Sequence, residues 1–128
     1  MMNLKRLCAG LILCGLLATL VAACSIRNVS PYSGPTVHMG GANFLQPSVT
    51  IQKWDKLMLI DDAASTHIIK NGSWVNGVAK PSKKPGAPTV DQTFNGNDSA
   101  IIGPFNTPGT YYLYCTIHPG MNLTVVVK

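Results

Sequence analysis

Residues 109–128, GTYYLYCTIHPGMNLTVVVK, contain two strand-like runs on either side of a short loop. Both runs are rich in aromatic or β-branched residues, which favour strands. In the first run, the alternation of side chains places Cys115 on the interior face and Tyr112 and Tyr114 on the opposite face. We therefore predict an antiparallel hairpin whose loop is TIHPGMN, residues 116–122.

The chain upstream of this hairpin shows the same pattern in shorter pieces. From Thr36 on, β-branched and aromatic runs alternate with Gly, Pro, Asn and Asp, and no window keeps a helical period. Such a pattern is typical of an all-β sandwich or barrel, here with about seven or eight strands. The segment from Lys70 to Asp98 is predicted to be an irregular excursion with one short strand near residues 89–94. The other expected strands cover residues 36–39, 48–53, 56–60, 66–70, 99–103, 110–115 and 122–128.

The N-terminus has the parts of a secretory signal peptide. MMNLKR carries two positive charges and precedes an apolar run from Leu7 to Ala23. A basic start followed by such a run predicts a signal peptide over residues 1–23 and an extracytoplasmic protein. An uncleaved membrane anchor is the alternative, because a transmembrane helix needs about 20 apolar residues.

The signal segment ends in LVAAC, and Cys24 is its last residue. This ending resembles the lipobox of bacterial lipoproteins, in which the cysteine is lipidated and becomes the first mature residue. The resemblance implies a lipid anchor on Cys24 to a bacterial membrane, a polar tether over residues 24–35 and a folded domain over residues 36–128. Ordinary cleavage after Ala23, which leaves Cys24 as a free thiol, is the alternative.

The four cysteines are not expected to form a disulfide within the folded domain. Cys8 and Cys14 lie inside the predicted signal peptide, and lipid would occupy Cys24. Only Cys115 then remains, and a single thiol in an oxidising compartment needs another explanation.

Charge and composition argue against two classes of function. The chain has ten Lys plus Arg and five Asp plus Glu, and without Lys5 and Arg6 the balance is eight against five, or +3. This modest excess is partly gathered in KPSKKPG and predicts no nucleic-acid partner. All five carboxylates are aspartates, which gives little material for catalysis by a carboxylate pair, so we do not expect an enzyme.

The loop after Cys115 carries a pattern of metal-binding side chains. His118 and Met121 follow Cys115 at intervals of three residues. A thiolate, an imidazole and a thioether together favour copper, and a type 1 copper site uses one Cys, two His and a weak axial Met. His38 and His67 are the candidates for the second histidine. We favour His67 because it begins an apolar run after the acidic bend DDAAS, from which its side chain can project toward the loop.

Other interpretations of these residues remain open. Taken singly, Cys115 could be a buried thiol, Met121 a core side chain and His118 a turn residue. Cys with two His is also a zinc set with an open position, although methionine is a poor zinc ligand.

The motif GTYYLYCTIHPGM, followed by an apolar last strand, resembles the C-terminal signature of the cupredoxins, the small blue-copper proteins that include plastocyanin and amicyanin. The resemblance covers Thr36 to Lys128 and implies a Greek-key sandwich and a monomer that passes single electrons between transient protein partners. Ile68 departs from the family pattern, since many members have there an Asn that ties the two ligand loops together. The implied ligands of one type 1 copper ion are His67, Cys115, His118 and Met121.

The resemblance also implies a route for electrons and leaves a rival function open. The exposed edge of His118 would meet the partner, within an apolar patch formed by Ile117, Pro119 and Met39. The rival is a lipoprotein that stores or delivers Cu(I), in which His38 and Met39 form part of a second soft site. A module that has lost its metal and only binds a partner is a third possibility.

Overall fold

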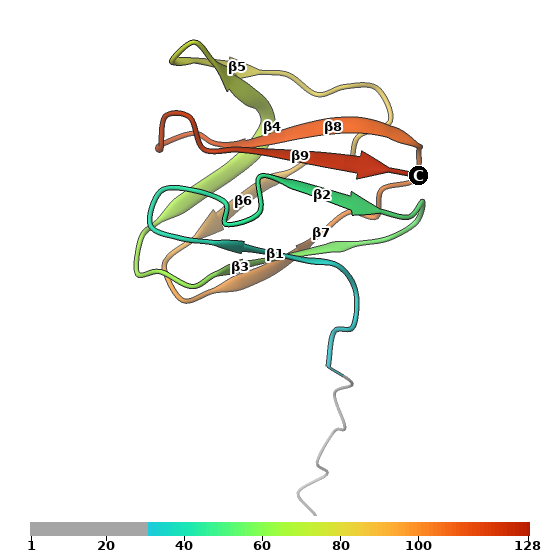
Figure 1. The fold of residues 1–128 in the computed structure, drawn as a ribbon, viewed down its shortest axis with the longest axis horizontal. Helices are drawn as coiled ribbons and strands as arrows, with labels where there is room; N and C mark the ends of the chain where they lie inside the picture. Colours follow the sequence, from blue (N-terminus) through green and yellow to red (C-terminus); the bar gives the residue numbers. More distant parts are fainter. Residues whose placement is uncertain (1–30) are drawn as a thin grey trace, which may run out of the picture. The chain divides into compact units, whose positions relative to one another are not determined.

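In a computed structural model of the chain, which describes residues 31–128, nine strands form two sheets (Figure 1). The predicted signal peptide, Cys24 and most of the predicted tether lie outside these residues. Among residues 31–128, no helix is long and apolar enough to cross a membrane. The strands are β1 (Thr36–Met39), β2 (Ser48–Ile51), β3 (Leu57–Asp61), β4 (His67–Val75), β5 (Val78–Pro81), β6 (Asp91–Phe94), β7 (Ser99–Ile102), β8 (Gly109–Cys115) and β9 (Asn122–Val127).

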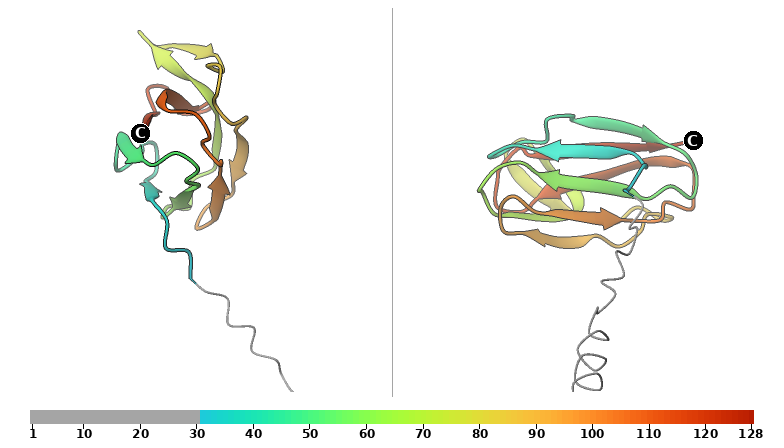
Figure 2. Two further views of the ribbon diagram at one scale, coloured as in Figure 1. Left: turned by 90° about the vertical axis from the view of Figure 1, so that its right-hand side faces the viewer. Right: turned by 90° about the horizontal axis from the view of Figure 1, so that it is seen from below.

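The two sheets face each other across an apolar core. The smaller sheet has the order β1-β3-β7, and the larger has the order β2-β9-β8-β4-β5 with β6 paired to β4. Figure 2 shows the smaller sheet on the near side of its right-hand view, with most of the larger sheet behind it. Strands β3, β8 and β9 bury every second side chain or more, and each large apolar side chain so buried contributes about 1.5–3 kcal/mol. The predicted all-β sandwich is confirmed.

The hairpin of β8 and β9 forms as predicted, with Tyr111 paired to Val125. Cys115 is fully buried, and Tyr112 is half exposed on the opposite face. Tyr114 shares the outer face with Tyr112 yet is only 3% exposed. It is covered because the ring of Trp74 packs edge-on against it, with 6.2 Å between centroids.

The expectation of irregular chain from Lys70 onward is wrong for its first part. Strand β4 continues to Val75 and turns directly into β5, with Val75 paired to Val78. This additional strand brings the total to nine, where about seven or eight were expected. Asn76 and Gly77 form the two-residue turn, with φ of 50° and 75°. Such a turn needs positive φ at both positions, which is why Asn-Gly is a preferred pair there. The dipeptide therefore marks a hairpin within the segment that was expected to be irregular.

Gly72 bends β4 at the base of this hairpin. Its φ is +132°, and an added Cβ would collide with the Lys80 carbonyl oxygen and lie 2.9 Å from the Tyr114 ring. Only glycine, which has no Cβ, tolerates this backbone conformation together with so close an approach of β5. The bend directs the end of β4 toward the β8–β9 loop, and both lie on the same side of Figure 1.

We expect Gly72→Ala to lower the free energy of unfolding by about 2 kcal/mol or more, because it adds a steric collision to backbone strain. Urea denaturation of the metal-free protein measures the change. Gly77→Ala is the matched control, since Gly77 also has a positive φ but has no atom within 4 Å of an added Cβ. Equal losses in the two variants would contradict the steric argument.

Candidate metal centre

Three of the four predicted metal ligands lie together at one end of the larger sheet. The donor atoms of His67, Cys115 and His118 all lie within 4.8 Å of one another. The Cys115 Sγ lies 3.4 Å from the His118 Nδ1, and the two imidazole rings have centroids 4.9 Å apart. His67 and Cys115 are fully buried, whereas His118 is partly exposed.

Strand pairing explains why His67 reaches this cluster. Ile69 of β4 pairs with Cys115, the last residue of β8. Because side chains alternate along a strand, His67 shares a face with Ile69. It precedes Ile69 by two residues, and in the antiparallel pairing this places it beyond the end of β8. The Thr116 amide donates to the Ile68 carbonyl at 2.9 Å. A main-chain hydrogen bond at residue 68 therefore joins the two ligand segments. The apolar side chain of Ile68 cannot form such a hydrogen bond itself.

The loop from Cys115 to Met121 is closed by its own main chain. The Cys115 amide donates to the Met121 carbonyl at 3.0 Å, and the Met121 amide donates to the His118 carbonyl at 3.1 Å. Met121 is 2% exposed. These bonds hold the third and fourth predicted ligands within a closed turn between two paired strands.

The hydrogen bonding of His67 fits a metal ligand. Both ring nitrogens of this fully buried side chain lack a hydrogen-bond partner. Buried polar atoms almost always have partners, and an ion is one explanation for those that do not. The thiol of Cys115 and the imidazole of His118 lie beside it, so the donor set suits a soft metal.

Asp61, at the end of β3, is a buried neighbour of the cluster that the sequence reading missed. Its Oδ1 accepts a hydrogen bond from the Ala63 amide at 3.1 Å and lies 3.6 Å from the His67 Nε2. A carboxylate in this place can orient a ligating imidazole through its second nitrogen. The sequence signal was present, because Asp61 occupies an inward position of the alternating strand LMLID.

Burial lowers the pKa of His67 below its ordinary value near 6.5; Asp61 opposes this shift and His118 adds to it. The folded domain therefore favours the neutral imidazole, which is the form that binds a metal.

The lowered pKa predicts how the stability of the metal-free protein depends on pH. Below about pH 6.5 His67 is protonated more readily in the unfolded chain than in the folded chain, so this part of the stability is present above pH 6.5 and is lost as the pH falls. One such group changes the free energy of unfolding by at most about 1.4 kcal/mol per pH unit. Urea denaturation between pH 7.5 and 5.5 should show that the free energy of unfolding falls more steeply with falling pH in His38→Gln, which keeps His67, than in His67→Gln. Equal pH dependence in the two variants would contradict this prediction.

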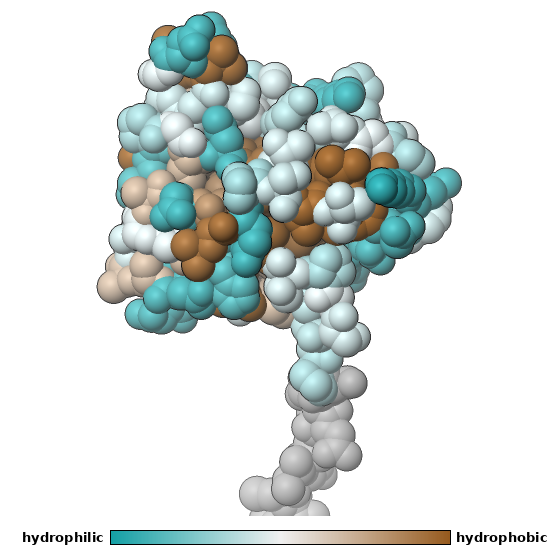
Figure 3. Space-filling model, in the orientation of Figure 1, coloured by the Kyte–Doolittle hydropathy of each residue, from teal (hydrophilic) through white to brown (hydrophobic). Residues whose placement is uncertain are grey.

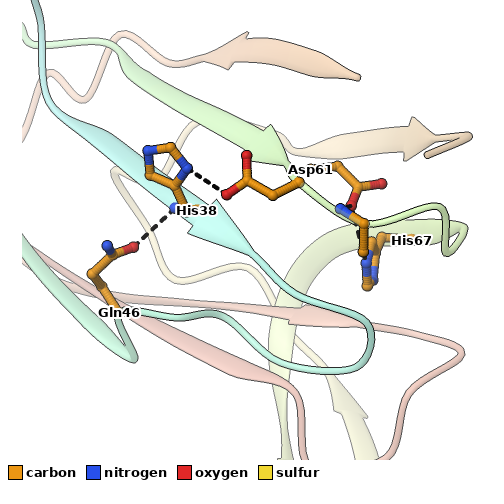
Figure 4. Close-up of polar contacts among 6 residues, drawn as sticks. His38, Gln46, Asp61 and His67 are labelled. Atoms are coloured by element: carbon orange, nitrogen blue, oxygen red, sulfur yellow. Dashed lines mark hydrogen bonds and ion pairs between the residues drawn. The ribbon is translucent and has the colours of Figure 1, made fainter. Parts of the chain in front are cut away.

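His38 does not join the metal cluster. The His38 Nδ1 lies 2.7 Å from the Asp62 Oδ2, and its amide donates to the Gln46 side chain at 2.8 Å (Figure 4). Met39 is fully buried, because neighbours along β1 point to opposite faces. Met39 therefore belongs neither to a surface patch nor to an exposed second site with His38.

Apolar side chains are exposed beside His118 and at the tip of the β4–β5 hairpin. Ile117 is 46% exposed beside His118, and Pro119 is exposed as well. Val75 and Val78 are about half exposed at the tip of the β4–β5 hairpin, where Figure 3 shows apolar surface beside hydrophilic residues.

Comparison with known proteins places the fold. No protein-family profile matches the sequence, and no curated protein matches it. Among solved structures, amicyanin from Paracoccus versutus (Thiobacillus versutus) is 21% identical over 77% of this chain and 84% of its own, with a TM-score of 0.59. A reduced Cu(I) form of an amicyanin proline-to-glycine variant is 18% identical over 76% of this chain and 84% of its own, with a TM-score of 0.58. A purple cupredoxin from Nitrosopumilus maritimus is 17% identical over 73% of this chain and 99% of its own, also with a TM-score of 0.58.

The structural likeness spans nearly all of the described residues, and at this sequence identity it establishes the fold only. The likeness confirms the cupredoxin fold that was expected from the loop motif and the strand pattern. The chain therefore has the cupredoxin fold, and it brings His67, Cys115 and His118 together in a cluster consistent with a type 1 copper site.

Proposed function

We propose that this protein is an extracytoplasmic electron carrier that binds one copper ion through His67, Cys115, His118 and Met121. The observation that carries the proposal is the convergence of three donor atoms within 4.8 Å, one of them from a fully buried histidine whose Nε2 lies 3.6 Å from the Asp61 carboxylate, beyond hydrogen-bond distance. The similar structure of an amicyanin variant is a Cu(I) form, which supports copper as the metal.

Copper bound at this site would supply a one-electron couple between Cu(I) and Cu(II). The protein contributes a thiol and two imidazoles held by paired strands, so the donor positions need to change little between the two oxidation states. The closed turn from Cys115 to Met121 and the bond from Thr116 to Ile68 supply this stiffness. Burial of His67 and Cys115 excludes water from their side of the cluster.

His118 is the side chain through which electrons would leave or enter. It is the partly exposed member of the cluster, and the exposed Ile117 and Pro119 lie on either side of it in the chain. An apolar surface of this small size suits brief contacts with redox proteins. We propose a monomer with transient protein partners and no catalytic activity of its own.

The proposed location rests on the sequence alone. The signal peptide over residues 1–23 would direct export, and lipid on Cys24 would hold the domain of residues 36–128 to a bacterial membrane through the tether of residues 24–35. The anchored domain would then exchange electrons with proteins on the periplasmic or cell-surface side.

Visible spectroscopy of the copper-loaded protein tests the proposed function. A Cu(II)-thiolate site of this type gives an intense visible band, and we expect this band to bleach on reduction and to return on reoxidation. Zinc-loaded protein is the control and should stay colourless. A colourless protein that holds Cu(I) very tightly would overturn electron transfer and favour copper storage or delivery.

A further inference from the structure

Trp74 makes a hydrogen bond to the main chain of the proposed cysteine ligand. Its indole Nε1 donates to the Cys115 carbonyl at 2.7 Å, across 41 positions of sequence. The indole N–H is a donor only and has a single direction. Its ring also packs edge-on against Tyr114, so the contact fixes both the angle and the distance of the carbonyl that precedes the loop.

Asn122, the first residue of β9, binds the main chain of the same tryptophan. The Trp74 amide donates to the Asn122 Oδ1 at 2.7 Å, and the Asn122 Nδ2 donates to the Trp74 carbonyl at 3.0 Å. Trp74 is thus hydrogen-bonded to both ends of the segment that carries Cys115, His118 and Met121.

The bend at Gly72 makes these contacts possible. Pairing between β4 and β8 ends at Asn71, which is matched with Leu113. A straight continuation would carry β4 along β8, away from Cys115. Because Gly72 turns the strand out of this register, Trp74 lies over Tyr114 and reaches Cys115 instead.

We propose that Trp74 and Asn122 form a clamp that positions the ligand loop. The clamp ties the β4 segment, which begins with His67, to the loop that carries the other donors. It thereby supplies a side-chain link between the two ligand segments, which Ile68 cannot supply. The hydrogen bonds of Trp74 go to the Cys115 carbonyl and the Asn122 side chain and not to a donor atom of the cluster, so Trp74 is a positioning residue.

Trp74→Phe tests the clamp, because it keeps an aromatic ring against Tyr114 and removes the N–H. Trp54→Phe is the matched control: Trp54 is 64% exposed and follows β2, whose end pairs with Val127 at the far end of β9 from the ligand loop. Three measurements are made on the full chain. Hydrogen exchange of the Cys115 and Met121 amides is followed in the metal-free protein, and the visible spectrum and reduction potential are recorded with copper bound.

We expect Trp74→Phe to speed exchange of these amides by about tenfold, the effect of one lost hydrogen bond. It should also shift the visible band and the potential, while Trp54→Phe changes neither. If Trp74→Phe fails to fold, Asn122→Ala removes the other half of the clamp and should move the same quantities in the same direction. In the double variant, the two effects should be less than additive.

The positioning of copper ligands rests on the proposed function, whereas the exchange measurement does not. If the wild-type chain takes up no copper but Trp74→Phe still speeds exchange, the proposed function fails and the clamp on the loop stands. If copper binds normally and both variants leave exchange, spectrum and potential unchanged, the clamp is overturned and the proposed function stands.

Discussion

His67→Ala will leave the protein with little or no copper after purification in the presence of the metal. His67 supplies one of the three donor atoms within 4.8 Å, and alanine leaves that buried position without a nitrogen. Loss of a residue that only supports a ligand typically costs 10–100-fold in metal affinity. Loss of a ligand should therefore cost at least about 100-fold. Metal analysis and competition with a copper chelator measure the change.

His38→Ala provides the matched control, because it makes the same substitution in a histidine that bonds to Asp62 outside the cluster. This variant should keep its copper. Unchanged copper content in His67→Ala would break the ligand assignment. Loss of copper in His38→Ala alone would transfer the role to His38.

Cys115→Ser will abolish the intense visible band of the copper-loaded protein. The band depends on the thiolate, and a serine hydroxyl stays protonated near neutral pH. Cys115 is the one free cysteine among residues 31–128, so no other thiol in the folded part can replace it. Absorption spectroscopy at equal copper content separates the loss of colour from the loss of metal.

Cys24→Ser is the control for this second substitution. It makes the same change in a thiol that we assign to the lipid anchor, and it should remove lipid while leaving the band intact. A Cys115→Ser protein that keeps the band would show that the thiolate is not a ligand, and the copper proposal would fail with it.

The sequence predicted well those features that depend on neighbouring residues. The hairpin of β8 and β9 was evident because alternation, β-branched residues and a loop with Pro and Gly all lie within residues 109–128. The donor spacing in the loop was evident for the same reason. The choice of His67 over His38 depended on where an apolar run begins, and His67 indeed begins β4 within reach of Cys115.

The missed features have two causes: glycines whose role in the chain is ambiguous, and contacts between residues distant in sequence. The hairpin of β4 and β5 was hidden because Gly72 and Gly77 resemble loop punctuation, although one makes a bend and the other a turn. Burial of Tyr114 depends on Trp74, which comes from another strand. Asp61 was read as part of a polar bend. Its inward position in the strand LMLID was visible in the sequence, but its approach to His67 crosses from one sheet to the other.

The pairing of β4 with β8 also has a consequence for how the protein would acquire the proposed copper ion. An unfolded chain already holds Cys115, His118 and Met121 close together, whereas His67 joins them only after a long loop has closed. Closing such loops slows folding. A metal that prefers the complete set stabilises the native state by mass action, by about 2.7 kcal/mol at 100 times its dissociation constant. If copper binds as proposed, the loop would offer it three ligands before folding is complete, and the arrival of β4 would add the fourth and tighten binding.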